Sequence, residues 1–249
     1  MRSSINNCDS RSDAESGQAR AQALALAKRI RKDNGWRGRF NAVYWSTTFL
    51  ITLIIEKYWP QRLDENSRVL NFGCGISFHE GAVNADVFVP HRWFRKRRRP
   101  DFYWTGLTEL PQIHDRFTGI VCEHVIEHML PDTVSILFLR LFKALAPGGT
   151  LVVSFPDVRS ALNGTANQGY SHPMVSANAM IYLYGHRFMY DAKIIQELLE
   201  VEGFADVRQV VFDEAPLKEF LNKHHKMESL YITAYKSATR EILIKPTSK

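Results

Sequence analysis

Short apolar runs separated by helical patterns make up the chain from Arg68 onward. The runs are rich in β-branched and aromatic residues, as strands are, and apolar residues recur at helical spacing between several of them. Alternating strands and helices predict an α/β fold with a doubly wound, Rossmann-like parallel sheet covered on both faces. Strands are expected in residues 69–72, 82–89, 101–107, 118–124, 150–155, 206–212 and 229–237.

The strongest helix pattern in this part is TVSILFLRLFKAL, and the sequence APGG that follows it is a typical helix stop. Before residue 68 the pattern differs. The first residues are polar, ARAQALALAKRIRK has helical spacing, and DNGW breaks it. We therefore divide the chain into a disordered tail (1–18), an N-terminal helical extension (19–66), one α/β domain (67–237) and a C-terminal tail (238–249).

Residues 40–55, FNAVYWSTTFLITLII, are the most hydrophobic window of the chain. The window is shorter than the roughly 20 residues that cross a bilayer, and it contains several Ser, Thr and Asn residues. Arg37 and Arg39 precede it, and Trp45 and Tyr58 lie within or beside it, as in helices that lie on a membrane surface. Two interpretations stay open: a helix packed on the domain, or an interfacial helix.

The composition narrows the class of protein. A chain of 249 residues that is 45% hydrophobic can bury the core of one globular domain with additions. Its formal charge of +6 suits an anionic partner without identifying one. The start of the chain lacks the apolar segment of a signal peptide. Cys8, Cys74 and Cys122 are too widely spaced for a disulfide framework or a zinc cluster, so we expect a cytoplasmic protein without bound metal.

The run VLNF ends at two glycines, Gly73 and Gly75. A glycine turn at the carboxyl end of a strand lets the backbone approach a ligand, although Gly-X-Gly is often only a tight turn. Phe78 occupies the place of the third glycine in the dinucleotide fingerprint, so that motif is not met. Asp86 ends the second strand, where a carboxylate can accept the hydroxyls of a ribose or cap a turn. The short spacing between these features implies a truncated first helix.

In this order the motifs resemble class I S-adenosylmethionine-dependent methyltransferases, specifically the type 11-like, bacterial glycan-associated subgroup. The resemblance covers about residues 68–235 and rests on VLNFGCG, NADV, GLTELP, FTGIVCEHVIEHM, LFKALAPGGTLVVSFPDV and HRFMYDAKIIQELLEVEGFADVRQV. It implies S-adenosyl-L-methionine as the cofactor. It also implies that the acceptor is a saccharide or another small metabolite, with cell-envelope glycan synthesis as the setting.

The resemblance assigns cofactor roles to matching positions. Gly73, Cys74 and Gly75 contact the methionine end of the cofactor, and Asp86 binds the ribose. Leu107 forms an apolar wall beside the adenine. Gly106 stands where relatives carry an acid that contacts the adenine amino group, so Thr105 or a backbone group would have to replace that contact.

Two further residues, Glu123 and His124, are expected at the carboxyl end of the fourth strand, beside the cofactor. The same stretch satisfies the inverted zinc-peptidase pattern HxxEH through His124, Glu127 and His128. On a helix, both histidines would lie on one face as zinc ligands, with Glu127 as a general base. We prefer the methyltransferase interpretation because it also explains the glycines, Asp86 and APGG.

The region after the fifth strand covers the substrate in relatives. It supplies Asp157, Arg187 and Tyr190 as candidate acceptor-binding residues. Candidate general bases are His124, His172 and His186, because histidine has a suitable pKa for taking a proton from a hydroxyl group. A structural role for each histidine is the alternative. Asp191 and Gly203 are expected to cap the helix that follows.

The stretch HRWFRKRRRP, residues 91–100, combines arginines with aromatic residues. It is either a solvated loop or a site for anionic glycans or lipid headgroups, and nucleic acid is an unlikely partner. Two hypotheses follow for the whole chain. The first is a cytoplasmic methyltransferase that acts on a saccharide or another small metabolite, with the basic loop as a candidate contact with an anionic membrane surface. The second is a non-catalytic, methyltransferase-like binding protein attached peripherally to the membrane.

Overall fold

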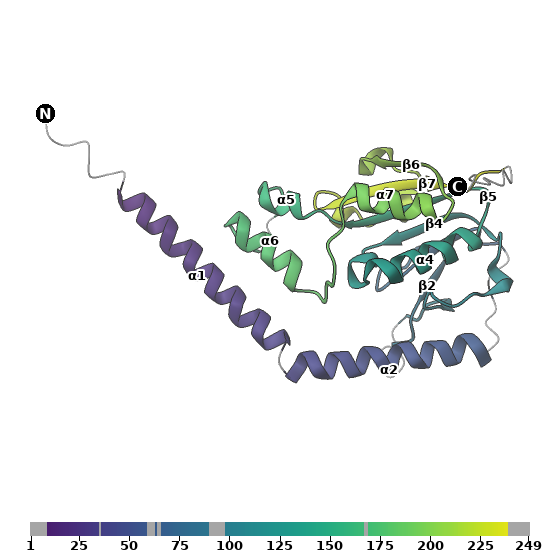
Figure 1. The fold of residues 1–249 in the computed structure, drawn as a ribbon, viewed down its shortest axis with the longest axis horizontal. Helices are drawn as coiled ribbons and strands as arrows, with labels where there is room; N and C mark the ends of the chain where they lie inside the picture. The colour runs from purple at the N-terminus through teal and green to yellow at the C-terminus, as the bar shows by residue number, and fades with distance from the viewer. Residues whose placement is uncertain are drawn as a thin grey trace, which may run out of the picture.

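A seven-stranded sheet forms the centre of the protein in this computed structural model, which describes residues 9–34, 36–58, 63, 66–89, 98–166 and 169–238 (Figure 1). The strand order is β3-β2-β1-β4-β5-β7-β6. This order confirms the predicted doubly wound, Rossmann-like fold. The strands are β1 (Val69–Phe72), β2 (Ala82–Asp86), β3 (Phe102–Tyr103), β4 (Phe117–Glu123), β5 (Leu145–Pro156), β6 (Ala205–Val210) and β7 (Ser229–Tyr235).

The sheet is mixed, which corrects the prediction of a parallel sheet. Strands β1 to β5 pair in parallel, but β7 runs antiparallel to both β5 and β6. A parallel return from β6 needs a crossover, usually an α-helix. Residues 211–228 contain only single-turn 3-10 helices, so the chain turns back instead. The 3-10 helices of the protein are Pro111–Ile113, Ile126–His128, Phe212–Glu214, Lys218–Phe220 and Lys223–His225.

Different segments cover the two faces of the sheet. Helices α4 (Pro131–Ala144) and α7 (Ala192–Val201) lie together on one face (Figure 1). Side chains of the segment 212–221 cover the opposite face, where they pack on Val121, Val152 and Tyr231. Side chains alternate along a strand, so successive residues of β4 and β5 point to opposite faces of the sheet. They therefore belong to two separate hydrophobic clusters, one on each face.

Helix boundaries follow the expected capping chemistry. Helix α4 ends at Ala144, with Leu145 between it and APGG, one residue before the predicted end. The carboxylate of Asp191 accepts a hydrogen bond from the Ile194 amide at 2.9 Å, and Gly203 follows α7 with φ +97°. The first contact confirms the predicted N-cap. The C-cap is Glu202 and not Gly203, which follows it with the positive φ that is common just after a C-cap.

The connection between β1 and β2, residues 73–81, contains turns and no helix. The sequence implied a truncated first helix here, but the structure has no helix between β1 and β2. Glycine explains the tight path: Gly73 and Gly75 both have positive φ, +70° and +51°. The third predicted strand is also shorter than expected, since only Phe102 and Tyr103 pair with β2.

Two long helices precede the sheet. Helix α1 (Asp9–Asn34) begins within the stretch that we expected to be disordered. A helix nucleated by the alanine-rich segment extends at little cost, because each added residue gains a hydrogen bond. Residues 1–8 and 239–249, which complete the two predicted tails, lie outside the described part. Helix α2 (Trp36–Tyr58) passes beside the β2 and β3 end of the sheet (Figure 1).

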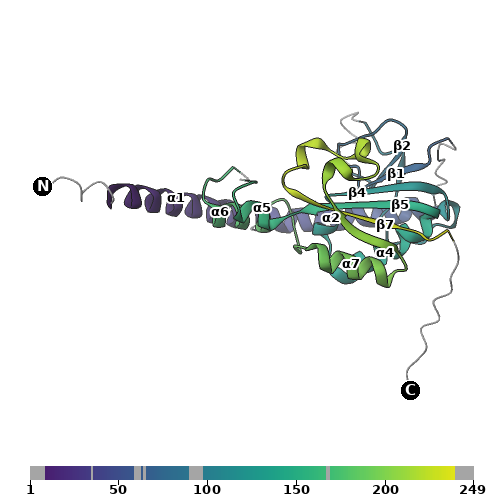
Figure 2. The same cartoon turned by 90° about the horizontal axis from the view of Figure 1, so that it is seen from above.

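The later part of α1 packs on α6 (Pro173–Tyr182), where Leu26 is buried against Val175 and Ala179. Helix α6 in turn contacts α5 (Val158–Leu162), so α1, α5 and α6 form a group at one end of the molecule (Figure 2). No helix in the described part of the chain is long and apolar enough to cross a membrane.

Candidate active site

The carboxyl ends of β1 and β2 meet at the predicted glycine turn. The amides of Gly73 and Cys74 both donate to the Ala85 carbonyl, at 2.8 and 3.0 Å. A Cβ at Gly73 would lie 2.3 Å from Cγ2 of Val125, which follows β4. The bare glycine backbone therefore reaches the end of β4, where a side chain would not fit.

Asp86 lies beside this turn, as predicted. Its Oδ2 accepts a hydrogen bond from the Gly75 amide at 3.0 Å, and its Oδ1 accepts one from the Val87 amide at 2.8 Å. The two amides orient the carboxylate at the carboxyl end of β2 while the side chain stays partly exposed. A glycine turn that touches such a carboxylate fits the methionine and ribose parts of S-adenosylmethionine.

Gly106 follows β3, and the structure explains why no acid stands there. Its φ is +76°, and a Cβ would lie 2.5 Å from Leu137 and 2.6 Å from Phe72. Thr105 is buried, with its amide bonded to Glu56 and its hydroxyl accepting from the Leu107 amide at 3.3 Å. The amide and the hydroxyl of Thr105 are therefore both in hydrogen bonds within the protein. Leu107 is half-buried and packs against the core.

Helix α2 is held at the same edge of the sheet. The Thr52 hydroxyl accepts a hydrogen bond from the Phe88 amide at 2.8 Å, just beyond β2. The Glu56 carboxylate accepts from the Thr105 amide and the Thr108 hydroxyl, just beyond β3. Thr48 and Thr52 are fully buried, whereas Trp45, Leu50 and Ile54 on the same helix are at least half exposed. One face of α2 thus packs on the domain.

Glu123 is the last residue of β4, and His124 follows it. Both oxygens of Glu123 face the Asn222 amide, at 3.2 and 3.0 Å, and burial raises the pKa of this carboxyl. His124 has a left-handed backbone, φ +52°. A non-glycine residue held there carries strain, which concentrates at functional sites. Its Nε2 lies 2.7 Å from the Ser229 hydroxyl.

The segment before β7 adds residues that the sequence interpretation did not select. The His225 ring lies 4.1 Å from the His124 ring, and its Nδ1 lies 2.8 Å from a carboxylate oxygen of Glu228. The hydrogen bond to Glu228 raises the pKa of His225. Strand direction explains the omission: β7 runs antiparallel and starts where β5 ends, so KHHKMES lies at the carboxyl edge of the sheet, whereas a parallel sheet was predicted.

Glu127 and His128 lie in the 3-10 helix that follows His124. The helical geometry that the zinc-peptidase alternative requires is therefore absent, because His124 precedes this helix with a left-handed backbone. Instead, His186 approaches Glu127 and His128, and one ligand atom from each of the three lies within 4.8 Å of the others. Burial lowers the pKa of His186.

The other predicted acceptor residues lie in varied places. Asp157 caps α5 through the Arg159 amide, and the Tyr190 hydroxyl donates to the Met129 carbonyl within the core. The backbone of Arg187 donates to the Glu127 carbonyl at 2.7 Å, while its side chain is exposed. His172 is exposed beside α1, where its amide donates to Gln22. The structure thus brings His124, His186 and Arg187 together and leaves His172 outside this group.

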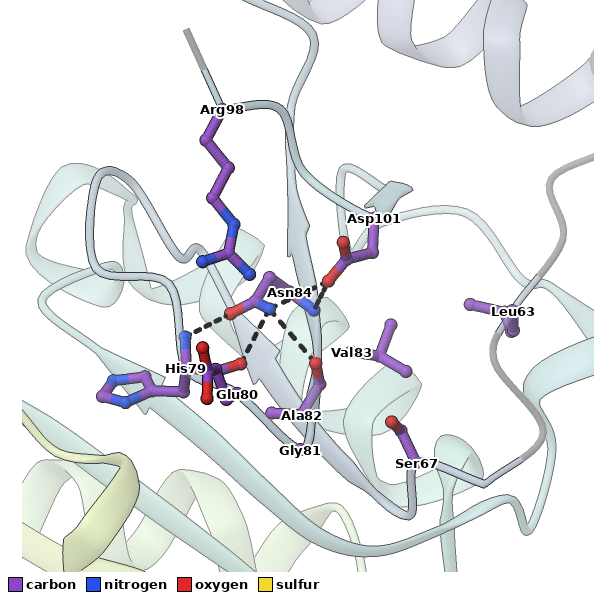
Figure 3. A pocket seen from close by; sticks show the side chains of 10 residues that line it. All are labelled: Leu63, Ser67, His79, Glu80, Gly81, Ala82, Val83, Asn84, Arg98 and Asp101. Atoms are coloured by element: carbon purple, nitrogen blue, oxygen red, sulfur yellow. Dashed lines mark hydrogen bonds between the residues drawn. The ribbon is translucent and has the colours of Figure 1, made fainter.

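Most of the predicted basic loop, residues 91–97, lies outside the described residues. Arg98 is described, and its guanidinium carbon lies 4.7 Å above the Phe78 ring, a cation–π contact. Arg98 also lines a cavity of about 510 Å³ (Figure 3). Asn84 crosses this cavity and bonds Asp101 through Nδ2 at 2.8 Å. The cavity lies at the amino ends of β1 and β2, opposite the glycine turn.

The strand order, the glycine turn and the oriented Asp86 together define a class I, S-adenosylmethionine-dependent methyltransferase. The chain belongs to the methyltransferase-domain family, whose model matches residues 44–209, more than half of its length. The search of curated proteins finds no match.

Several solved structures are similar to this chain at low identity. They include a SAM-dependent methyltransferase from Archaeoglobus fulgidus (16% identity, 81% of this chain and 100% of the other, TM-score 0.46). A second is an S-adenosylmethionine-dependent methyltransferase from Mesorhizobium loti (17% identity, 70% of this chain and 93% of the other, TM-score 0.42). A third is phosphoethanolamine N-methyltransferase 2 from Haemonchus contortus, in complex with S-adenosyl-L-methionine (14% identity, 76% of this chain and 53% of the other, TM-score 0.41).

Proposed function

We propose that this methyltransferase transfers its methyl group to a hydroxyl group of a saccharide or another small metabolite, in the synthesis of a cell-envelope glycan. One observation carries the proposal: His124 stands strained at the end of β4, between Glu127 and Ser229. The next residue, Val125, packs on the glycine turn. A histidine beside the methyl donor suits an acceptor that must lose a proton.

S-adenosylmethionine, when bound, would supply a methyl group on a sulfonium, from which an acceptor oxygen would displace S-adenosylhomocysteine. The residues of the chain position the two partners and exclude water. Gly73 and Gly75 give the donor access to the backbone, and Asp86 offers acceptor atoms to its ribose. His124 takes the proton from the acceptor hydroxyl. Its ring is oriented by Ser229 on one side and Glu127 on the other.

Cofactor binding is tested by calorimetry with Asp86→Asn. This change keeps the shape of the side chain but removes its charge and one acceptor, so affinity should fall about 10- to 100-fold, as expected for a charge-assisted hydrogen bond. Asp101→Asn is the matched control, because Asp101 also accepts hydrogen bonds, but from Asn84 in the middle of β2, whereas Asp86 accepts one from the glycine turn. Equal affinities for Asp86→Asn and the wild type would contradict the assignment.

The acceptor class is tested with S-adenosylmethionine that carries a labelled methyl group. The wild-type protein is incubated with envelope saccharide fractions and, separately, with pooled small metabolites. Label in the saccharide fraction that His124→Gln does not produce supports the proposal. Label found only in non-saccharide metabolites would exclude the glycan setting, and undiminished labelling by His124→Gln would exclude His124 as the base.

A cytoplasmic location with peripheral membrane contact belongs to the same proposal. The buried thiols of Cys74 and Cys122 suit a reducing compartment. The exposed Leu50 and Ile54 of α2 form an apolar face that suits a lipid surface. Co-sedimentation with anionic vesicles should fall in Leu50→Glu, whereas Val201→Glu, which adds the same charge at an exposed valine of α7, should bind as the wild type does.

A further inference from the structure

Glu127 has a buried carboxylate whose oxygens accept no hydrogen bond from the described residues. The residue is 1% exposed, and neither carboxylate oxygen has a hydrogen-bond donor among the described residues. Nδ1 of His124 is 3.3 Å from Oε1, without the geometry of a hydrogen bond. The residue is nevertheless fixed, since its carbonyl accepts the amides of Arg187 and Phe188 at 2.7 and 3.2 Å. A carboxylate buried in this way normally has a positive partner.

Two imidazoles face this carboxylate. The rings of His128 and His186 lie 5.2 Å apart, inclined at 61°. Nδ1 of His128 lies 3.2 Å from the Gly185 carbonyl, and Nδ1 of His186 lies 2.5 Å from the Met180 carbonyl. A carbonyl only accepts, so each Nδ1 carries the hydrogen, and in the neutral ring Nε2 then keeps its lone pair. Histidines that bind metals are oriented by the same outer hydrogen bond.

We propose that Glu127, His128 and His186 bind a divalent transition-metal ion, for which Zn²⁺ is the best match. Two imidazole nitrogens and one carboxylate oxygen are the three protein ligands of many zinc sites that keep an open position. Mg²⁺ and Ca²⁺ prefer oxygen ligands throughout. His124 is not a ligand in this arrangement, because its Nε2 faces Ser229 while its Nδ1 faces Glu127. This inference departs from the metal-free protein that the sequence predicts.

The position of the ion gives it a role in methyl transfer, and this role rests on the proposed function. Val125, between His124 and the 3-10 helix, contacts the glycine turn, so the site adjoins the donor side of the sheet edge. An acceptor hydroxyl in the open position would have its pKa lowered by the ion. His124 would then receive a proton that the acceptor releases readily.

The test measures metal binding by the full-length protein without cofactor or acceptor, so its result is independent of the proposed function. After dialysis against a chelator, calorimetry with ZnCl₂ should give one site per chain, and Co²⁺ should give visible absorption bands. Glu127→Gln, His128→Gln and His186→Gln should each weaken zinc binding by more than about tenfold. His172→Gln removes an exposed histidine elsewhere and should not change the affinity.

Circular dichroism identifies any variant that fails to fold. His128 is exposed, so His128→Gln keeps the test decisive even if the buried Glu127 cannot be replaced. Absence of zinc binding by the wild type, or unchanged affinity in a folded His128→Gln, would overturn the proposal. Equal competition by Mg²⁺ would also overturn it, because the ligand set would then not select for nitrogen-binding metals.

Discussion

Val125 occupies the space that a side chain at Gly73 would need. The closest approach would be 2.3 Å, between Cγ2 of Val125 and a Cβ built on Gly73. The contact joins the end of β4 to the glycine turn after β1, two adjacent parallel strands. It therefore couples the cofactor turn to His124 and Glu127 on either side of Val125, and any shift of the turn must displace them.

Gly73→Ala should abolish cofactor binding. The change adds a clash with Val125 to the cost of a left-handed backbone, which is about 1–2 kcal/mol for a residue with a Cβ. Gly81→Ala is the matched control, because Gly81 has a similar φ, +79°, but no atom within 4 Å of the new Cβ. Calorimetry with S-adenosylmethionine should show binding by Gly81→Ala only. Normal affinity in Gly73→Ala would mean that the turn does not approach the cofactor.

Gly106→Asp, which inserts the acid that relatives carry, should destabilise the protein and not improve cofactor binding. Any side chain at this position would overlap Phe72 and Leu137, at 2.6 and 2.5 Å. Overpacking of a core typically costs about 1–3 kcal/mol. Gly148→Asp, at φ +79° in open space, controls for the backbone cost. Urea unfolding should show the larger loss for Gly106→Asp, and equal losses would contradict the packing argument.

The order of motifs was enough to predict the sheet, the glycine turn and Asp86, because these depend on local apolar runs and on where strands end. The direction of β7 was missed, since strand direction depends on the length and path of the segment before it. Missing that direction also concealed His225 and Glu228. The meeting of Glu127 with His186 could not be predicted, because a long stretch separates them in the sequence and only the folded loop joins them.

Helix α2 should loosen when its tie to β2 is removed. The Thr52 hydroxyl accepts from the Phe88 amide, so Thr52→Val leaves a donor without its partner and should cost about 1–3 kcal/mol locally. Thr47→Val is the control. Both hydroxyl groups donate to the carbonyl four residues earlier, Thr52 to Thr48 and Thr47 to Val43, but Thr47 is exposed. Hydrogen exchange should rise at Phe88 and along α2 in Thr52→Val alone. Unchanged exchange there would show that Glu56 suffices to hold the helix.

The pair of His225 and Glu228 should make stability depend on pH. Their hydrogen bond raises the folded pKa of His225 above the ordinary 6.5, and the nearby Glu123 and Glu127 carboxylates add to the effect. The unfolded chain binds this proton less tightly, so the contribution is complete below about pH 6.5 and is lost as pH rises through the folded pKa. Wild type should therefore exceed Glu228→Gln in stability at pH 6, by up to about 1 kcal/mol for a partly exposed pair, and this difference should shrink at pH 9. Glu219→Gln removes an exposed carboxyl of the same segment and should show no such pH-dependent difference in thermal unfolding. A constant difference between wild type and Glu228→Gln at both pH values would show that Glu228 does not raise the pKa of His225 in the folded protein.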